Sequence, residues 1–135
     1  MRIVVLAVGR LRPPFADDVE HYRRLLARHV RLELIEVREE ERLARRVPER
    51  AYVSLLHREG EMMDSLGFSR FLETRRASGM DLCFLLGGPH GLEREEADHR
   101  FSLGKVTLPH QLARVVLLEQ LLRAHKILAG EPYHY

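Results

Sequence analysis

The groups best suited to chemistry gather near the carboxyl end of the chain. Residues 133–135 are Tyr-His-Tyr, and a histidine can exchange a proton near neutral pH. Arg114, Glu119 and Arg123 interrupt the apolar stretch 112–129 that precedes this tail. Glu119 and Arg123 are four residues apart, a spacing at which two side chains on one helix pair with each other. A core helix with one internal salt bridge and a frayed end is the purely structural alternative.

Several common kinds of active site have no motif in the sequence. The histidines show no H-E-x-x-H spacing, and Cys83 is the only cysteine, so neither a metal site nor an internal disulfide is expected. No glycine-rich phosphate loop and no G-x-S-x-G elbow of a serine hydrolase is present. Residues 87–91, Gly-Gly-Pro-His-Gly, offer bare backbone that a flat ring or another segment can approach closely, or simply a tight turn.

The order of apolar runs predicts an α/β domain with a mainly parallel sheet and helices on both faces. The runs 3–8 and 81–86 are continuous and aliphatic, which is the pattern of strands buried on both sides. Segments with helical spacing and short connections separate such runs. The expected strands are 3–8, 32–37, 51–56, 81–86 and an extended segment from 102, and the expected helices are 15–29, 39–47, 69–78, 93–99 and 109–129.

Local signals predict where some of these elements begin and end. Pro109 suits the first turn of the last helix, and Thr107 offers a capping hydroxyl just before it. Ser69 is expected to cap the helix over 69–78. Residues 57–60 are polar and are expected to form a turn after the third strand.

Composition sets broader limits. A chain of 135 residues with 45% apolar content fits one domain, 1–135, with a core of its own. A net charge of +2 permits nucleic-acid binding without requiring it. The single cysteine favours the reducing cytoplasm, and neither a signal peptide nor a bilayer-spanning run is expected.

Ligands of parallel sheets bind beyond the carboxyl ends of the strands. Three segments are expected at that position: the turn after Leu56, the glycine loop 87–91, and residues 103–108. Reasoning from the residues alone therefore ends at an α/β domain with a glycine-lined pocket and a polar tail.

Five motifs together carry a resemblance to a known family. The motifs are Phe84-Leu-Leu-Gly-Gly-Pro-x-Gly-Leu92, Ser102-Leu-x-Lys-Val-Thr-Leu-Pro-His110, Arg114-Val-Val-Leu-Leu-Glu-Gln120, Arg123-Ala124 and Gly130-x-Pro-Tyr-His134. With them the sequence resembles the RlmH family of SPOUT enzymes, which methylate N3 of pseudouridine 1915 in 23S ribosomal RNA of the assembled ribosome. The match extends over essentially the whole chain and is densest from Asp81 onward.

The resemblance implies a fold and a cofactor. It implies a trefoil-knotted α/β fold, a homodimer built on the knot region, and S-adenosylmethionine bound by the knot loops. That cofactor carries no phosphate, which agrees with the missing phosphate loop. The cofactor-binding residues that the resemblance implies are Leu56, Gly87, Leu103, Gly104, Lys105, Val106, Thr107 and Leu108.

The resemblance also implies roles in the methyl transfer. His134 is expected to act as base or to position the substrate, with Tyr133 stacking or hydrogen bonding, and the tail is expected to act across the dimer interface. Arg123 and Arg114 are expected either to hold RNA phosphate or to organise the dimer helix, and His110 to cap or pack. Further basic residues expected to meet RNA are Arg10, Arg12, Arg23 and Arg24.

Two alternatives remain open at this point: a SPOUT enzyme acting on another RNA such as transfer RNA, and a non-catalytic RNA-binding α/β domain. The chain also departs from the family pattern. Tyr135 stands where a basic residue is usual, His90 where an acidic residue is frequent and His57 where an aspartate is common, and the region 39–49 is short.

Overall fold

The first half of the chain alternates strands and helices as expected. The computed structural model describes residues 1–87 and 97–133. Strand β1 (Arg2–Val8) leads to helix α1 (Phe15–Leu26) and strand β2 (Arg31–Val37). A single 3-10 turn, η1 (Glu40–Arg42), then continues into the short helix α2 (Leu43–Arg46).

The second half contains the longest strand and the longest helix among the described residues. Strand β3 (Tyr52–Met62) is followed by helix α3 (Ser65–Ser78) and strand β4 (Leu82–Leu86). Strand β5 (His99–Ser102) and helix α4 (His110–Leu128) complete the described elements. The predicted helix over 93–99 is wrong at its end, because His99 begins a strand, and residues 93–96 lie outside the described part.

The five strands form one sheet in the order β2-β1-β4-β3-β5, and every pair of neighbours is parallel. β1 and β4 lie at its centre, and all five residues of β4 are buried. Ile3 is paired with Leu82 and Leu6 with Leu85, so the most aliphatic runs of the sequence lie side by side. This confirms the predicted α/β class and its parallel sheet.

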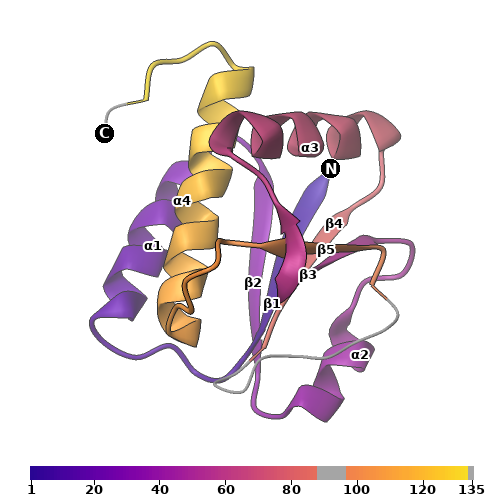
Figure 1. Ribbon diagram of the computed structural model, residues 1–135, viewed down its shortest axis with the longest axis vertical. Coiled ribbons are helices and arrows are strands. Elements are labelled where there is room, and N and C mark those ends of the chain that lie inside the picture. Colours follow the sequence, from indigo (N-terminus) through magenta and orange to yellow (C-terminus); the bar gives the residue numbers. More distant parts are fainter. Residues whose placement is uncertain (88–96, 134–135) are drawn as a thin grey trace.

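Helices cover both faces of the sheet, but very unequally. Ile3, Val5 and Ala7 of β1 point into a core shared with α1, α3 and α4, while Val4 and Leu6 point to the opposite face. On that opposite face the short helix α2 contributes Leu43. In Figure 1, α1 and α4 stand side by side, α3 crosses the upper part of α4 on the side away from α1, and α2 lies apart from them.

Helix α4 is the element on which the other two large helices pack. It begins after Pro109, as predicted, but no side chain caps its first turn, so the expected Thr107 cap is wrong. The chain between 103 and 109 is irregular, and Thr107 is exposed there. The i,i+4 pair predicted within this helix is present, since Arg123 Nε donates to Glu119 Oε1 at 3.1 Å.

Strand β3 does not turn at residues 57–60 as predicted but continues to Met62. Its second half pairs with β5 after a shift in register between Leu56 and Glu61. Gly60 permits the close approach of the two strands, because a Cβ there would lie only 2.5 Å from the backbone nitrogen of Phe101. Leu56 and Glu61 both face Phe101, so residues 57–60 form an irregularity within the strand rather than a turn that ends it.

The start of α3 also differs from the prediction. The helix begins four residues earlier, with Asp64 as N-cap accepting a hydrogen bond from the backbone nitrogen of Gly67 at 2.7 Å. Ser69 is buried inside the helix and donates to the carbonyl of Leu66. An aspartate is as good an N-cap as a serine, so the earlier of two competing caps defines the start.

Candidate functional site at the carboxyl edge of the sheet

The described parts of the three segments expected to bind a ligand lie toward one edge of the sheet, and residues 88–91 of the glycine loop lie outside the described residues. β4, β3 and β5 are consecutive in the sheet, and Leu55 of β3 is paired with Leu85 of β4 while Leu56 is paired with Phe101 of β5. Gly87 follows directly after β4, and residues 103–108 follow directly after β5. Gly87 and residues 103–108 therefore lie where parallel strands end, and Leu56, although it is inside β3, is level with them because it pairs with Phe101 near the end of β5. We call Leu56, Gly87 and residues 103–108 the cradle.

The run 103–108 exposes backbone and one aliphatic side chain. Ser102 Oγ donates to the carbonyl of Gly104 at 2.9 Å and accepts from its nitrogen at 3.1 Å, which fixes a tight bend. Gly104 has a φ of 134°, a conformation that disfavours any side chain. Val106 is 78% exposed, although it is hydrophobic. Leu103 and Leu108 are half-buried and hold the two ends of the run in place.

The tail leaves α4 at the end that is farther from the cradle. Helix α4 separates residues 103–108 from Tyr133, and its 19 residues make it about 28 Å long at 1.5 Å per residue. Figure 1 shows the chain entering α4 at its lower end and the tail leaving at its upper end. The structure therefore does not bring Tyr133 or Arg123 to the cradle of the same chain. His134 and Tyr135 lie outside the described residues.

Glu119 connects the two described residues that the sequence assigned to catalysis. Its Oε1 accepts hydrogen bonds from the Tyr133 hydroxyl at 2.7 Å and from Arg123 Nε at 3.1 Å. The guanidinium carbon of Arg123 lies 4.2 Å from the centre of the Tyr133 ring, a cation–π distance. The other oxygen of Glu119 accepts from Gln120 Nε2 at 2.7 Å, and Gln120 in turn accepts from Ser65 Oγ at 2.9 Å.

These contacts decide the protonation state of Tyr133. Partial burial, followed by the hydrogen bond to Glu119 and its negative charge, raises the pKa of Tyr133 to about 12. Burial and the charge of Glu119 also raise the pKa of Tyr22. Both phenols are therefore protonated at neutral pH. Tyr133 can donate a hydrogen bond or stack on a base, but it is not poised to remove a proton.

Arg114 lies inside the protein, and not on the surface where a residue that binds RNA is expected. It is 4% exposed and binds inside the molecule. Its Nη1 donates to Glu36 Oε2 at 2.9 Å, and its Nη2 donates to the carbonyls of Val8 and Gly9 at 2.7 Å each. Burial lowers the pKa of Arg114, and the Glu36 carboxylate opposes that effect. Arg114 thus joins α4 to the ends of β1 and β2, and RNA phosphate cannot reach it.

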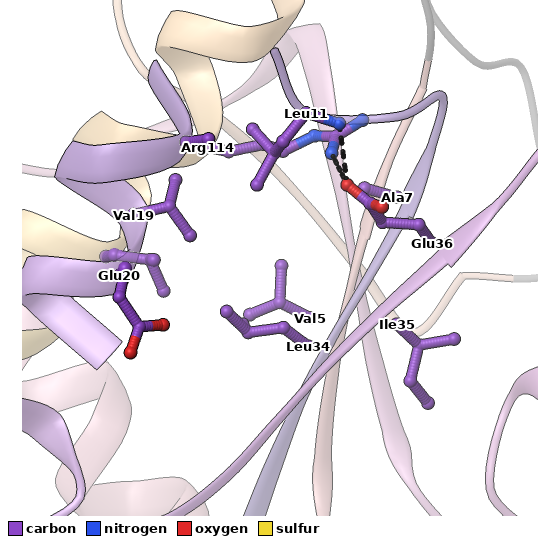
Figure 2. Close-up of a pocket in the computed structure, with 11 residues that line it drawn as sticks. Val5, Ala7, Leu11, Val19, Glu20, Leu34, Ile35, Glu36 and Arg114 are labelled. Carbon is purple, nitrogen blue, oxygen red and sulfur yellow. Dashed lines mark hydrogen bonds and ion pairs between the residues drawn. The ribbon is translucent and has the colours of Figure 1, made fainter. Parts of the chain in front are cut away.

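A cavity of about 470 Å³ lies beside this pair, between α1, α4 and the strands β1 and β2. Its walls are largely aliphatic, with Val5, Val19 and Leu34 among them. Figure 2 shows Arg114 and the backbone of Leu11 converging on the same carboxylate oxygen of Glu36 at its rim. The cavity is separate from the cradle. Its strand residues come from β1 and β2, whereas the cradle is formed by residues of or following β3, β4 and β5.

Sequence reasoning missed Glu36 and Gln111. Glu36 shares a strand face with Leu34, and a charge on an otherwise apolar face is a signal that a partner is needed. Gln111 accepts from the backbone nitrogen of Arg12 at 2.8 Å and donates to the carbonyl of Arg10 at 3.0 Å. No local pattern indicates this contact, because the partners are about a hundred residues apart in the chain.

Comparison with known proteins identifies the family. A family model described as "Predicted SPOUT methyltransferase" matches residues 1–134. The chain belongs to the SPOUT methyltransferase family. Membership implies S-adenosylmethionine as methyl donor, and the cradle fits such a molecule, since it combines exposed backbone, a glycine without Cβ contacts and the exposed Val106.

Three similar relatives of this SPOUT methyltransferase carry the name Ribosomal RNA large subunit methyltransferase H. The protein of Rubrobacter xylanophilus is 44% identical, with 99% of this chain and 98% of that protein covered. The protein of Gemmatimonas aurantiaca is 40% identical and that of a Thermotoga species 35%, again over essentially the whole of both chains. The recognised resemblance is thereby confirmed.

Two structural observations concern other kinds of site. Among residues 1–87 and 97–133, no group of three or more His, Cys, Asp or Glu side chains is placed to hold a metal ion. Within the same part of the chain, no helix has the length and apolar character needed to cross a membrane.

Proposed function

We propose that this protein transfers a methyl group from S-adenosylmethionine to N3 of pseudouridine 1915 in 23S ribosomal RNA of the assembled ribosome, acting in the cytoplasm as one domain, 1–135. The observation that carries the proposal is the cradle, because three segments far apart in the sequence meet at the sheet edge where such folds bind ligands. The names of the relatives favour large-subunit ribosomal RNA as the substrate.

The cradle residues would hold the cofactor chiefly through their backbone. Leu56, Gly87 and residues 103–108 present N–H and C=O groups that can read the edge of an adenine, while Val106 and the half-buried Leu103 supply apolar contact to its ring. The bound cofactor supplies an electrophilic methyl group on a sulfonium. The chain itself must align the acceptor nitrogen with that methyl group and exclude competing water.

The tail is proposed to complete the site of a second protomer. Within one chain the tail leaves α4 at the end opposite the cradle, and Tyr133 folds back only as far as Glu119, which lies nine residues, or about 14 Å, beyond the first residue of the helix. A homodimer in which the α4 helices of two protomers run past each other would bring the tail of one to the cradle of its partner. The half-buried apolar residues Leu112, Val115 and Val116 of α4 support a contact along this helix. We include in the proposal a trefoil knot formed by the carboxyl-terminal segments.

Methyl transfer forms a bond from the methyl carbon to N3, breaks its bond to sulfur, and releases the N3 proton. Tyr133 is a poor acceptor for that proton, because its pKa is about 12 and it already donates to Glu119. Its proposed role is therefore to stack on the base or donate to it. Arg123, held by the same carboxylate, would offer positive charge to the pyrimidine or a nearby phosphate. His134 remains our proposed base or positioning group.

A labelling experiment tests the substrate. Ribosomes from a strain that lacks this modification are incubated with the protein and methyl-labelled cofactor, and the RNA species are separated. We expect label in 23S ribosomal RNA at the single predicted nucleoside. Label in transfer RNA alone would support the other SPOUT enzyme, and failure to bind millimolar S-adenosylmethionine in isothermal titration would support a non-catalytic RNA-binding domain.

A further inference from the structure

The loop between β1 and α1 carries two arginines whose surroundings differ from those of the other candidate RNA ligands. Arg23 pairs with Glu20 at 2.6 Å, and Arg24 lies 3.4 Å from the same carboxylate. Arg10 and Arg12 are exposed, and no described carboxylate forms an ion pair with either side chain. The sequence alone gives no reason to distinguish the four arginines. In the structure, however, the positive charges of Arg10 and Arg12 are available to a ligand.

The backbone that carries Arg10 and Arg12 is held at several points. Glu36 accepts from the nitrogen of Leu11 at 2.8 Å, and Gln111 bonds to the nitrogen of Arg12 and to the carbonyl of Arg10. Arg114 donates to the carbonyl of Gly9 just before them. A loop that is fixed in this way loses little conformational entropy when its side chains bind.

The anchoring contacts also place the loop beside the cradle. Gln111 lies in the first turn of α4, a few residues after 103–108. A Cβ on Gly9 would lie 3.9 Å from Nε2 of His110, the first residue of the same helix. Burial and the charges of Arg114 and Arg12 lower the pKa of His110, as expected where cations gather. Figure 1 shows this loop passing beneath the lower end of α4, on the side where the chain enters the helix.

The charge of this corner is suited to phosphate. Lys105 of the cradle is exposed, and Arg38 follows the end of β2, whose Val37 carbonyl accepts from the nitrogen of Gly9 at 2.8 Å. Glu36 is the nearest carboxylate, and Arg114 neutralises it at 2.9 Å. Asp17 and Asp18 oppose the positive charge from the first turn of α1, where they face the favourable end of the helix dipole.

We propose that Arg10 and Arg12 form an arginine ridge that binds the RNA phosphates flanking the target nucleotide. The inference rests on the proposed function, because it takes the RNA to be the substrate that enters the cradle. Arg presents a planar fork that can bind two oxygens of one phosphate. The ridge then sets the register of the RNA, while the cradle and the tail act on one base.

The test compares R10Q/R12Q with the charge-matched control R23Q/R24Q. Binding to ribosomes that lack the modification is measured at several salt concentrations, together with the affinity for S-adenosylmethionine. We expect R10Q/R12Q to weaken ribosome binding by roughly tenfold or more at low salt and to make the slope of log K against log salt shallower by about 0.7 for each phosphate that is no longer neutralised. Cofactor affinity should stay within twofold of wild type in both variants, and R23Q/R24Q should bind ribosomes as wild type does.

Two results would overturn the arginine ridge: an unchanged salt slope in R10Q/R12Q, or an equal loss in R23Q/R24Q. Because the readout is binding, it is independent of turnover. Wild-type protein that binds ribosomes through the ridge but transfers no methyl group would refute the proposed function and leave the ridge standing. Wild-type protein that does not bind ribosomes would refute both.

Discussion

Tyr133 donates a hydrogen bond to Glu119 at 2.7 Å, from a tail residue to a helix residue fourteen positions earlier. The contact turns the tail back along α4 and places the Tyr133 ring over Arg123. One carboxylate thus fixes both described residues that the sequence assigned to catalysis. Through Gln120 and Ser65 it is also joined to the start of α3. Glu119 is therefore a positioning residue for the tail.

Replacing Glu119 by glutamine should alter Tyr133 without unfolding the protein. The substitution removes the negative charge that helps to raise the pKa of Tyr133, so that pKa should fall from about 12 toward its ordinary value of 10, while burial keeps it somewhat above that value. Misplacement of the tail should lower turnover by roughly tenfold or more. Titration of tyrosine labelled with ¹³C at the phenolic carbon, followed by NMR, measures the pKa.

The matched control for E119Q is E20Q, which removes a carboxylate from the exposed pair with Arg23 on α1. This control should leave both the Tyr133 pKa and turnover unchanged. A variant E119Q with wild-type turnover and a lowered Tyr133 pKa would show that the contact is structural only. A Tyr133 pKa that does not move would contradict the hydrogen bond itself.

The sequence predicted those features that depend on runs of similar residues. The aliphatic runs 3–8 and 81–86 became the central strands, and the apolar stretch after Pro109 became α4. Gly87 and residues 103–108 follow directly after β4 and β5, as the predicted strand order requires, while the binding of a ligand there stays a prediction. Such features follow from local composition and from the general geometry of sheets.

Features set by distant contacts could not be predicted. The extension of β3 depends on Gly60 meeting Phe101 of β5. The role of Arg114 depends on Glu36, 78 residues earlier. The i,i+4 pair of Glu119 and Arg123 was predictable, but the third partner was not, since a terminal residue has no periodicity to indicate where it folds.

Gly60 supports a prediction that the packing of β3 against β5 affects cofactor binding by the cradle. In G60A the new Cβ would lie 2.5 Å from the nitrogen of Phe101 and 2.7 Å from the carbonyl carbon of Arg100, so β5 must move. Because residues 103–108 continue from β5, we expect a loss of about 3 kcal/mol in stability and weaker binding of S-adenosylmethionine. Urea unfolding and isothermal titration measure the two effects.

Gly79 offers the control for G60A. It ends α3 with a φ of 75°, and a Cβ added to it would have no atom within 4 Å. G79A should therefore cost about 1 kcal/mol through backbone strain alone, with unchanged cofactor affinity. Equal cofactor affinity in G60A and wild type would show that cofactor binding does not depend on the β3–β5 contact, and would refute the prediction.

His125 predicts a pH dependence of stability. It is 4% exposed, and burial lowers its pKa below the ordinary 6.5 more strongly than the hydrogen bond to the Leu121 carbonyl raises it. Arg76 of α3 and His29 beside α1 face it and lower the pKa further. Below about pH 6.5 the unfolded chain therefore binds a proton that the folded protein does not, and stability falls as the pH decreases.

In H125Q this contribution should vanish. The free energy of unfolding, measured between pH 5 and 7.5, should decline less steeply toward acid in the variant than in wild type, by up to about 1.4 kcal/mol per pH unit. Parallel pH profiles for wild type and H125Q would contradict the assignment, whatever the absolute stability of the variant.

Val106 provides the sharpest test of the cradle, because a hydrophobic side chain that is 78% exposed contributes little to folding and has most of its surface left to bury on a ligand. V106S should therefore leave urea unfolding unchanged within about 0.5 kcal/mol. Its dissociation constant for S-adenosylmethionine should rise about five- to tenfold, corresponding to about 1 kcal/mol of apolar burial removed. M80S, where Met80 is 40% exposed and precedes the amino end of β4, removes an exposed apolar group at the opposite edge of the sheet and should bind the cofactor as wild type does. If V106S bound the cofactor normally, the adenine would have to lie elsewhere, and the cavity beside Arg114 would become the next place to look.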